Sequence, residues 1–206
     1  MTTVNSQSGP SAATRSRIVE AALSTLKREG FSGASARAIA RTGDFNQALI
    51  FYHFGSVKNL LLTALDHTSA ARMEQYQRAV ADADTLEDLV AVAGQIYRED
   101  VEAGHITVLS EMIAGCLSHP ELRPEVLARM EPWIDFCEEV ITRVVRDSDI
   151  GRFLPIRDLA YAIASFYLGV NLLTHLDGDR ARVESLFGAA ARLAPVLSPM
   201  FGSRSE

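Results

Sequence analysis

Apolar residues recur along most of the chain at the spacing of an α-helix. In the first such stretch, within residues 14–29, the apolar positions are Ile18, Val19, Ala22, Leu23 and Leu26. Positions i, i+1, i+4, i+5 and i+8 share one face of a helix, so this stretch predicts a helix with one buried side, which Gly30 ends. No stretch shows the alternation of apolar and polar residues that predicts a strand. The sequence therefore predicts an all-α fold.

The same periodicity predicts helices along the rest of the chain. They are expected over residues 36–41, 47–53, 56–82, 86–103, 105–118, 121–145, 156–176 and 180–197. Pro132 lies inside one of them and should either kink it or mark its real start. Residues 151–155 are expected to form a loop. Residues 1–13 are rich in Ser, Thr, Gly and Gln without periodicity, which predicts a disordered tail.

Two domains are expected, with residues 14–66 as a three-helix domain and residues 67–206 as a second helical domain. Ser56 can cap the long helix between them. Its leucines, such as Leu61 and Leu65, should pack on the first three helices, while its far end should lie in the second domain. One helix shared by two domains could act as a lever.

Residues 35–54 predict a helix-turn-helix. Ser35 is a good N-cap for a short helix, and Gly43 is expected to end that helix in a left-handed conformation. Asn46 is expected to cap the second helix. Ile50 and Phe54 lie one turn apart on it and should face inward.

The outer face of this second helix has the chemistry of a DNA-reading surface. It is expected to carry Gln47, Ala48, Leu49, Tyr52 and His53. Gln can read adenine through two hydrogen bonds, Ala and Leu can touch a thymine methyl, and Tyr and His can donate to phosphate. The face therefore favours docking in the major groove.

The segment from Thr14 to about Leu65 resembles the DNA-binding domain of the TetR family of bacterial transcriptional regulators. The resemblance is carried by Gly30-Phe31, Ser35-Ala36-Arg37-Ala38-Ile39-Ala40, Phe51-Tyr52-His53-Phe54 and Leu60-Leu61-Leu62. It implies that Ser35, Arg37 and Asn46 belong to the DNA-binding surface with the outer face of the second helix. Arg15 and Arg17 form either a solvated helix start or, as the resemblance suggests, a phosphate clamp or minor-groove arm.

Two positions depart from the family pattern. Phe51 stands where the family usually has a phosphate-donating Tyr, and Phe cannot donate. Val57 stands where the family usually has Lys, with Lys58 one residue later. One residue turns a helical side chain by about 100°, so Lys58 is expected to reach the DNA backbone from another direction or not at all.

The net charge of −6 is divided unevenly along the chain. Residues 1–66 hold seven Lys or Arg and four Asp or Glu, a balance of +3, and the totals of 20 and 26 leave 13 and 22, or −9, for residues 67–206. The positive charge thus coincides with the predicted reading helix, and the acidic remainder would repel a duplex and help to orient the molecule.

The sequence predicts no enzyme, no metal site and no cofactor. It has no Gly-rich phosphate loop and no nucleophile or zinc motif, and its histidines are scattered. Cys116 and Cys137 lack metal or pairing spacing, which favours two small buried residues over a redox-sensing pair. No secretion signal opens the chain, and the apolar run Leu159–Leu173 is short for a membrane span and is interpreted as a buried helix. A cytoplasmic protein without membrane partners is expected.

The second domain is expected, by the resemblance, to bind a small molecule between its helices. Candidate lining residues are Tyr97, Met112, Trp133, Phe136, Tyr167, Asn171 and His175, with His105 and Glu111 as further polar contacts. For each of these residues, a position in an ordinary core is the favoured interpretation and a ligand contact is the alternative. The aromatic bias weakly favours a flat or apolar ligand.

The last two helices are apolar over more than one face and must be covered on two sides. One side can pack within the chain, and the other is expected to meet a second copy. The candidate interface consists of Ala160, Ala164, Leu168, Leu186, Ala190 and Leu193. The alternative is a helix in the middle of a monomer's core.

These observations predict a ligand-responsive regulator, by default a repressor, that binds a palindromic operator in double-stranded DNA as a homodimer. A C2 dimer presents two reading helices, so half-sites should lie about 34 to 36 Å apart or a multiple of that. An unidentified effector would favour another arrangement and lower DNA affinity. The alternative function is a helical protein-interaction scaffold without specific DNA binding.

Overall fold

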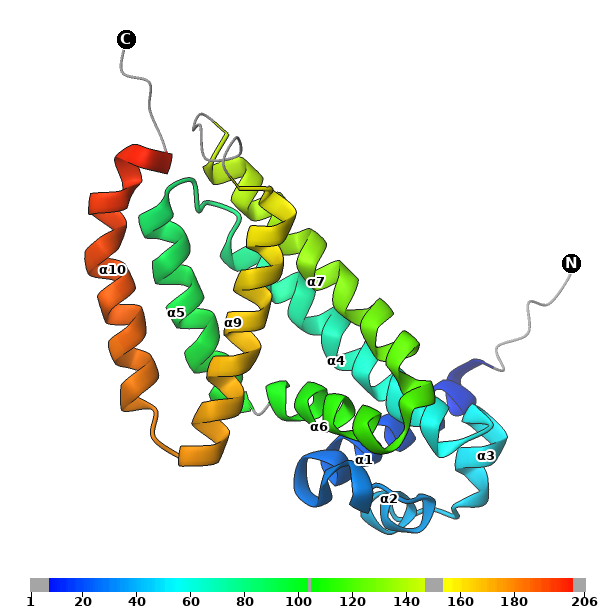
Figure 1. Ribbon diagram of the computed structural model, residues 1–206. Helices are drawn as coiled ribbons and strands as arrows, with labels where there is room; N and C mark the ends of the chain where they lie inside the picture. Colours follow the sequence, from blue (N-terminus) through cyan, green and yellow to red (C-terminus); the bar gives the residue numbers. More distant parts are fainter. Residues whose placement is uncertain (1–7, 104, 147–153, 202–206) are drawn as a thin grey trace, which may run out of the picture. The chain divides into compact units, whose positions relative to one another are not determined.

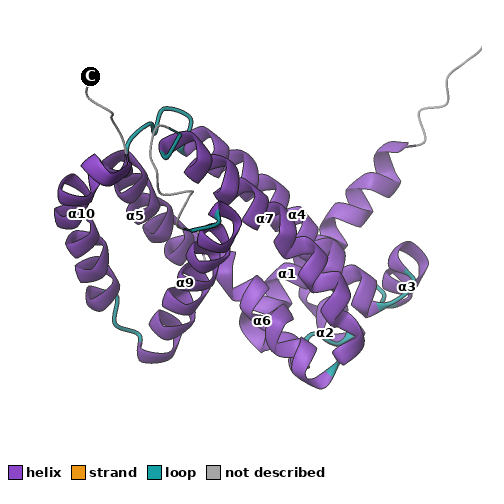
Figure 2. Ribbon diagram, turned by 45° about the horizontal axis from the view of Figure 1, so that its top comes forward, coloured by secondary structure: helices purple, strands orange, loops and turns teal. Residues whose placement is uncertain are grey.

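The computed structural model describes residues 8–103, 105–146 and 154–201. These residues form helices joined by short connections (Figure 1). The elements are α1 (Ser8–Gly33), α2 (Ala36–Gly43), α3 (Ala48–Phe54), α4 (Val57–Ala79), α5 (Leu86–Ala103), α6 (His105–Ser118), the 3₁₀ turn η1 (Pro120–Leu122), α7 (Arg123–Val144), α9 (Ile156–Asp177) and α10 (Ala181–Phe201). No strand occurs within these ranges (Figure 2), and the all-α prediction is confirmed.

Most helix boundaries lie within three residues of the sequence expectation, and α1 and α10 extend further than expected. Helix α1 begins at Ser8, so residues 8–13 are helical instead of part of a tail. Helix α10 continues to Phe201. Pro132 lies inside α7. Most of the expected loop over residues 151–155 lies outside the described residues.

The chain divides into two compact units. The N-terminal unit consists of Met1–Ala70 and Thr107–Val126, and the C-terminal unit of Ala71–Ile106 and Leu127–Glu206. The sequence placed one boundary near residue 66 and did not anticipate that residues 107–126 return to the first unit. Helix α4 is continuous across the boundary at residue 70.

Residues 107–126 belong to the N-terminal unit because their apolar side chains complete its core. Val108, Met112 and Leu122 are at most 2% exposed, in the same cluster as Ile18 and Leu26 of α1. Met112 is therefore a core residue of the N-terminal unit, and its expected place among ligand-lining residues of the second domain is wrong.

Helix α6 is also bound to α1 through a polar contact. Gly30 takes a positive φ of 71°, and the next amide, Phe31 N–H, donates to the Glu111 carboxylate at 2.7 Å. A Cβ on Gly115 would lie 2.5 Å from the Phe31 ring, so only glycine lets the two helices approach this closely here. Glu111 thus satisfies the backbone at the kink of α1, and its expected role as a ligand contact is not supported.

The described residues of the C-terminal unit form two smaller apolar cores. One joins Ile134 and Ile141 of α7 to Ala160 of α9. The other joins Tyr97 of α5, Val170 of α9 and Val183 of α10. Figure 1 shows α5 beside α10, in agreement with their many close contacts.

Both cysteines are free thiols. Cys116 is buried in the core of the N-terminal unit, and Cys137 is half-buried against the α7–α9 core. Burial raises the pKa of the Cys137 thiol to about 11. These environments disfavour the thiolate, as in small apolar core residues.

Helix α9 is long and apolar enough to cross a membrane by length and composition, with a mean hydropathy of 1.4 in its most apolar window and 22% of that window buried. The sequence interpretation as a buried helix is therefore wrong for a single chain. Its inner face carries buried polar groups, among them Asn171 and Thr174. The outer face is apolar and exposed.

Candidate functional site

The helix-turn-helix begins where the sequence placed it. Ser35 is the N-cap of α2, and its hydroxyl oxygen accepts from the Ala38 amide at 3.2 Å. At the other end of α2, Asp44 adopts the left-handed conformation with φ 50°, and its N–H donates to the Ala40 carbonyl. The prediction that Gly43 takes this conformation is wrong.

Glycine is needed at position 43 because a side chain would not fit there, and not because the backbone takes a left-handed conformation. A Cβ there would lie 2.3 Å from the Phe45 ring and 2.8 Å from the Ala21 Cβ. The missing side chain lets α2 and the Phe45 ring pack against α1. Asp tolerates the left-handed region better than most residues, which explains Asp44 at the next position.

Helix α3 begins at Ala48, one residue later than expected. The N-cap of α3 is Gln47, so the prediction that Asn46 takes this position is wrong by one residue. The Asn46 side-chain oxygen still accepts from the Ala48 amide at 2.8 Å. Ile50 and Phe54 are buried, at 0% and 7% exposure. Because the inward residues are fixed by the core, the outward face of α3 is fixed too.

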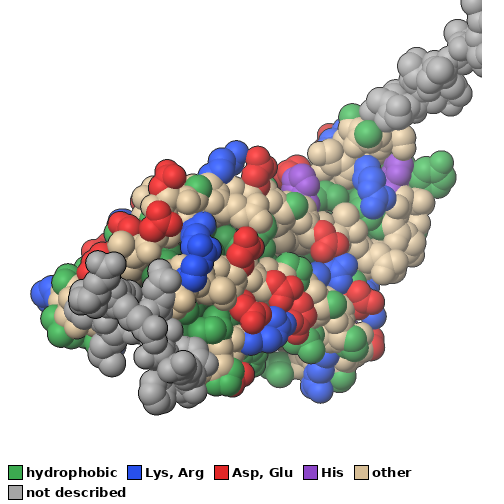
Figure 3. Space-filling model, turned by 90° about the horizontal axis from the view of Figure 1, so that it is seen from above, with side chains coloured by type: hydrophobic (Ala, Val, Ile, Leu, Met, Phe, Trp, Pro, Cys, Tyr) green, Lys and Arg blue, Asp and Glu red, His purple; other side chains and the backbone are tan. Residues whose placement is uncertain are grey.

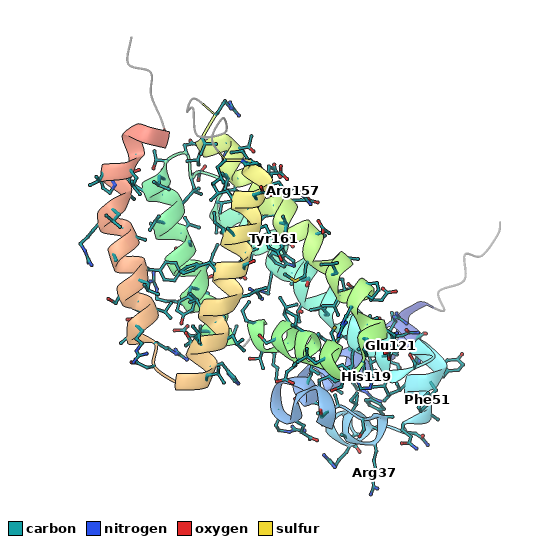
Figure 4. All side chains as sticks on the ribbon, viewed as in Figure 1. Arg37, Phe51, His119, Glu121, Arg157 and Tyr161 are labelled. Carbon is teal, nitrogen blue, oxygen red and sulfur yellow. The ribbon has the colours of Figure 1, made fainter. Side chains whose placement is uncertain are left out.

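That outward face carries most of the predicted reading residues. Gln47, Ala48 and Tyr52 are exposed, with Tyr52 at 81%. His53 is half-buried, and its ring centroid lies 4.9 Å from that of Tyr52 and 6.4 Å from that of Phe54. Leu49 is half-buried and packs against the core, so it turns outward less than expected. Phe51, which stands where the family pattern usually has a hydrogen-bond-donating Tyr, is 51% exposed on the same helix (Figure 4).

The arginines around the motif differ in what they contact. Arg15 Nη1 donates to the His53 carbonyl at 2.8 Å, and its guanidinium lies 4.3 Å from the Phe54 ring centroid. Arg17 lies 5.8 Å from the Phe45 ring centroid. Both therefore fasten α1 to the turn and α3. Arg37 is exposed and extends away from α2 (Figure 4), whereas Lys58 is half-buried.

Charge on the molecular surface is mixed. On the face shown in Figure 3, Lys and Arg side chains lie interspersed with Asp and Glu side chains.

A second polar site lies buried in the C-terminal unit. Arg72 of α4 pairs with Asp100 of α5, and both side chains are less than 8% exposed. The Asp100 carboxylate also accepts from the hydroxyls of Tyr76 and Tyr167. Burial raises the pKa of both tyrosines, so the hydroxyls stay protonated and donate.

Four of the predicted ligand residues surround or support this cluster. The Trp133 and Phe136 rings lie 5.4 and 6.4 Å from the Tyr76 ring. Tyr167 contributes its hydroxyl, and Asn171 donates to the Tyr167 carbonyl.

Two other predicted ligand residues lie elsewhere in the C-terminal unit. The Tyr97 hydroxyl forms a hydrogen bond with the Thr174 hydroxyl at 2.8 Å. Its ring lies tilted against that of Phe187 in the other apolar core. His175 is exposed near the end of α9.

Sequence reasoning missed Arg72 and Asp100. Arg72 and Tyr76 are spaced i, i+4 on α4, which places them on one face. Asp100 follows Ile96 and Tyr97 on the buried side of α5. Each of the two successive helices α4 and α5 thus carries one charged residue where its helical pattern places an apolar one. This was the signal from which the sequence could have predicted the pair.

The predicted interface residues divide into two groups. Ala160 is fully buried within the chain and Ala164 packs beside it, so these two are core residues of the protomer. Leu168 and Ala190 are half-buried, and Leu186 and Leu193 are 50% and 55% exposed.

The exposed apolar surface of α9 and α10 is broader than predicted. Its further members are Tyr161, Ile163, Phe166, Leu172, Leu173, Leu176, Val196 and Leu197. Tyr161 is seen on α9 in Figure 4, one turn after Arg157. We call this set the α9–α10 apolar face.

The described part of the chain shows no candidate metal-binding site. No group of three His, Cys, Asp or Glu side chains there could hold a metal ion. The clustered carboxylates Glu131, Asp135 and Glu138 all bind Arg157.

Residues 18–64 match the family model described as bacterial regulatory proteins, tetR family. The HTH-type transcriptional repressor NicS of Pseudomonas putida is 34% identical over 58 residues, which cover 28% of this chain and 27% of NicS. The match thus spans about a quarter of this curated relative.

Solved structures extend the likeness to most of the chain. The multidrug binding protein EbrR complexed with imidazole has a TM-score of 0.62 at 25% identity, covering 88% of this chain and 94% of EbrR. FadR from Bacillus subtilis in complex with stearoyl-CoA has a TM-score of 0.71 at 13% identity, covering 87% and 96%. Likeness at 13% identity shows the fold alone. The expected fold, a helix-turn-helix domain followed by a helical domain, is confirmed.

Proposed function

We propose that the chain is a cytoplasmic, ligand-responsive repressor with a DNA-binding domain of the TetR family, and that it binds a palindromic operator as a homodimer. The carrying observation is the outward face of α3. Gln47 and Tyr52 are exposed there, while Ile50 and Phe54 hold the helix on the core. A polar and aromatic face on a fixed helix suits base and phosphate contacts in the major groove.

The homodimer is supported by the α9–α10 apolar face. Large apolar side chains exposed on two consecutive helices of one unit are typical of an interaction surface. A second copy of the chain can cover this face with the same face, as twofold symmetry requires. A membrane could also cover the apolar side of α9. However, α9 turns buried polar groups such as Asn171 toward its own unit, and the exposed apolar residues continue on α10.

Ligand response is supported by the continuity of α4. This helix begins three residues after α3 ends and continues to the buried Arg72 and Tyr76. A small molecule that changes the partners of these residues therefore acts on the helix that follows the reading helix. Differential binding to two arrangements is sufficient to couple the sites.

The test is selection of bound fragments from a pool of random duplex DNA, in moderate salt that suppresses purely electrostatic binding. A sequence-specific regulator enriches one motif over successive rounds. Folded wild-type protein that enriches none, with or without cell extract as a source of small molecules, would contradict the proposal and favour a protein-interaction scaffold.

A further inference from the structure

We propose that the buried cluster around Arg72 binds the effector, and that the effector is a small molecule with a carboxylate on a flat aromatic body. Arg72, Tyr76 and Tyr167 would hold the carboxylate, and Trp133 and Phe136 would contact the body. The regulatory consequence rests on the proposed function, but the binding site itself does not.

The first observation is an unsatisfied donor. Arg72 is 6% exposed, and its Nη2 donates to Asp100 Oδ2 and to the Tyr76 hydroxyl. Its Nε–H is buried without any acceptor. A buried donor left unpaired costs free energy, and an arginine presents its donors as a planar fork that fits a carboxylate. The missing partner is therefore an oxygen acceptor.

The second observation is the polarity of the surrounding groups. Three donors from two helices converge on one carboxylate oxygen of Asp100, which lies on α5. They are Arg72 and Tyr76 on α4 and Tyr167 on α9. These donors form a site suited to a carboxylate, and in this structure the Asp100 side chain fills it. A ligand carboxylate would compete for the same donors.

The aromatic rings decide the shape of the ligand body. The Arg72 guanidinium carbon lies 5.1 Å from the Tyr76 ring centroid and 5.7 Å from that of Trp133. The Tyr76 ring also faces Phe136 at 6.4 Å. Flat apolar walls next to the donors favour an aromatic group attached directly to the carboxylate.

A cationic ligand fits the same site less well. Asp100 Oδ2 already accepts from three donors, so it has little capacity left for another. An amine would also meet the fixed positive charge of Arg72 in a buried environment, where like charges repel strongly. Binding of a cationic ligand is therefore the result that would contradict the proposal.

The experiment is a fluorescence titration of the full-length protein without DNA. Trp133 is the single tryptophan of the chain, so its emission reports on this site directly. Benzoate is the anionic probe, and benzyltrimethylammonium is the cationic probe of similar size. We expect a saturable change with benzoate and none with the cation. A saturable response to the cation alone, or to neither probe, would overturn the proposal.

Two variants make the test specific. Asp100→Asn removes the internal competitor and should tighten benzoate binding about fivefold or more. Arg72→Gln removes the anchor and should weaken it about tenfold or more, as expected for loss of a charge-assisted hydrogen bond. Arg157→Gln, a surface arginine of the same unit, is the control and should leave binding unchanged.

The Asp100→Asn result keeps the proposal falsifiable if Arg72→Gln fails to fold. Weaker benzoate binding by a folded Asp100→Asn protein would overturn it, because that carboxylate would then be part of the ligand site instead of a competitor. Failure of these titrations leaves the DNA selection untouched, and failure of the selection leaves the titrations untouched, so the two proposals are tested separately.

Discussion

Single side chains of the same type serve different purposes in the N-terminal unit. Arg15 is engaged by a backbone carbonyl and an aromatic ring, whereas Arg37 is exposed. Burial and partners, which the sequence does not display, separate a residue that fastens the domain from one available to DNA.

We expect Arg37→Ala and Gln47→Ala each to weaken binding to the selected duplex by about 1 to 3 kcal/mol per lost base contact. Both residues are exposed, so the free energy of unfolding should change little. Fluorescence anisotropy measures the affinity, and urea denaturation measures the stability. Arg78→Ala, at an exposed arginine of α4 that pairs with Glu74, is the control. Equal affinity of all three variants and wild type would argue against the reading face.

Cys137 should behave as an inert thiol in the folded protein. Its pKa is about 11 because the side chain is desolvated, against an ordinary value of 9.0. At pH 8 the thiolate fraction, and hence alkylation by iodoacetamide, should be about a hundredfold lower than in the unfolded chain. Peptide mass spectrometry measures the rate at this residue. Fast labelling under native conditions would instead indicate a reactive thiol.

The same shift predicts the direction of a pH effect on stability. A pKa raised on folding stabilises the folded state below the unfolded value of 9.0, and this contribution is lost as pH rises from about 9 to 11. Cys137→Ala should reduce the loss of stability over that range, as followed by thermal unfolding.

At the scale of the helices, periodicity and capping residues were sufficient to predict most elements. Helices α5 and α6 have the bounds that the sequence indicated, because Gly104 and the residues before Leu86 interrupt the pattern clearly. What periodicity cannot tell is which core an apolar face enters. Met112 and Glu111 look like any residues of a sensing helix, yet both serve the N-terminal unit.

The candidate site was predictable to the same extent. The outward face of α3 followed from local spacing, since Ile50 and Phe54 fix its orientation. The Arg72–Asp100 pair did not, because it joins residues 28 positions apart in sequence. Gly43 was identified as important for the wrong reason, since the need for space arises from Phe45 and the distant Ala21.

Gly43→Ala should therefore destabilise the N-terminal unit. The added Cβ would meet the Phe45 ring and Ala21 Cβ at distances below 3 Å, and overpacking of this kind costs about 1 to 3 kcal/mol. Gly94→Ala in α5 is the matched control, because its nearest neighbours would lie at 3.6 Å, an ordinary contact distance. Urea denaturation of both variants measures the difference. A Gly43→Ala protein as stable as Gly94→Ala would show that α2 does not need this close approach.

At the scale of the whole molecule, the α9–α10 apolar face is the proposed dimer interface. Leu193→Glu should prevent dimerisation, because a charge buried in an apolar interface without a partner is costly. Sedimentation velocity should show a monomer for this variant and a dimer for wild type. Leu117→Glu, at a leucine that is 79% exposed on α6, is the control and should remain dimeric. A dimeric Leu193→Glu protein would place the interface elsewhere.

The most direct measurement is the mass of the complex formed on one short duplex that carries the selected site. The proposed function predicts two chains per duplex and a site with twofold symmetry, because each copy contributes one α3. Native mass spectrometry distinguishes this from other stoichiometries. One chain per duplex, or a site without a twofold axis, would contradict the dimeric operator-binding regulator proposed for this chain.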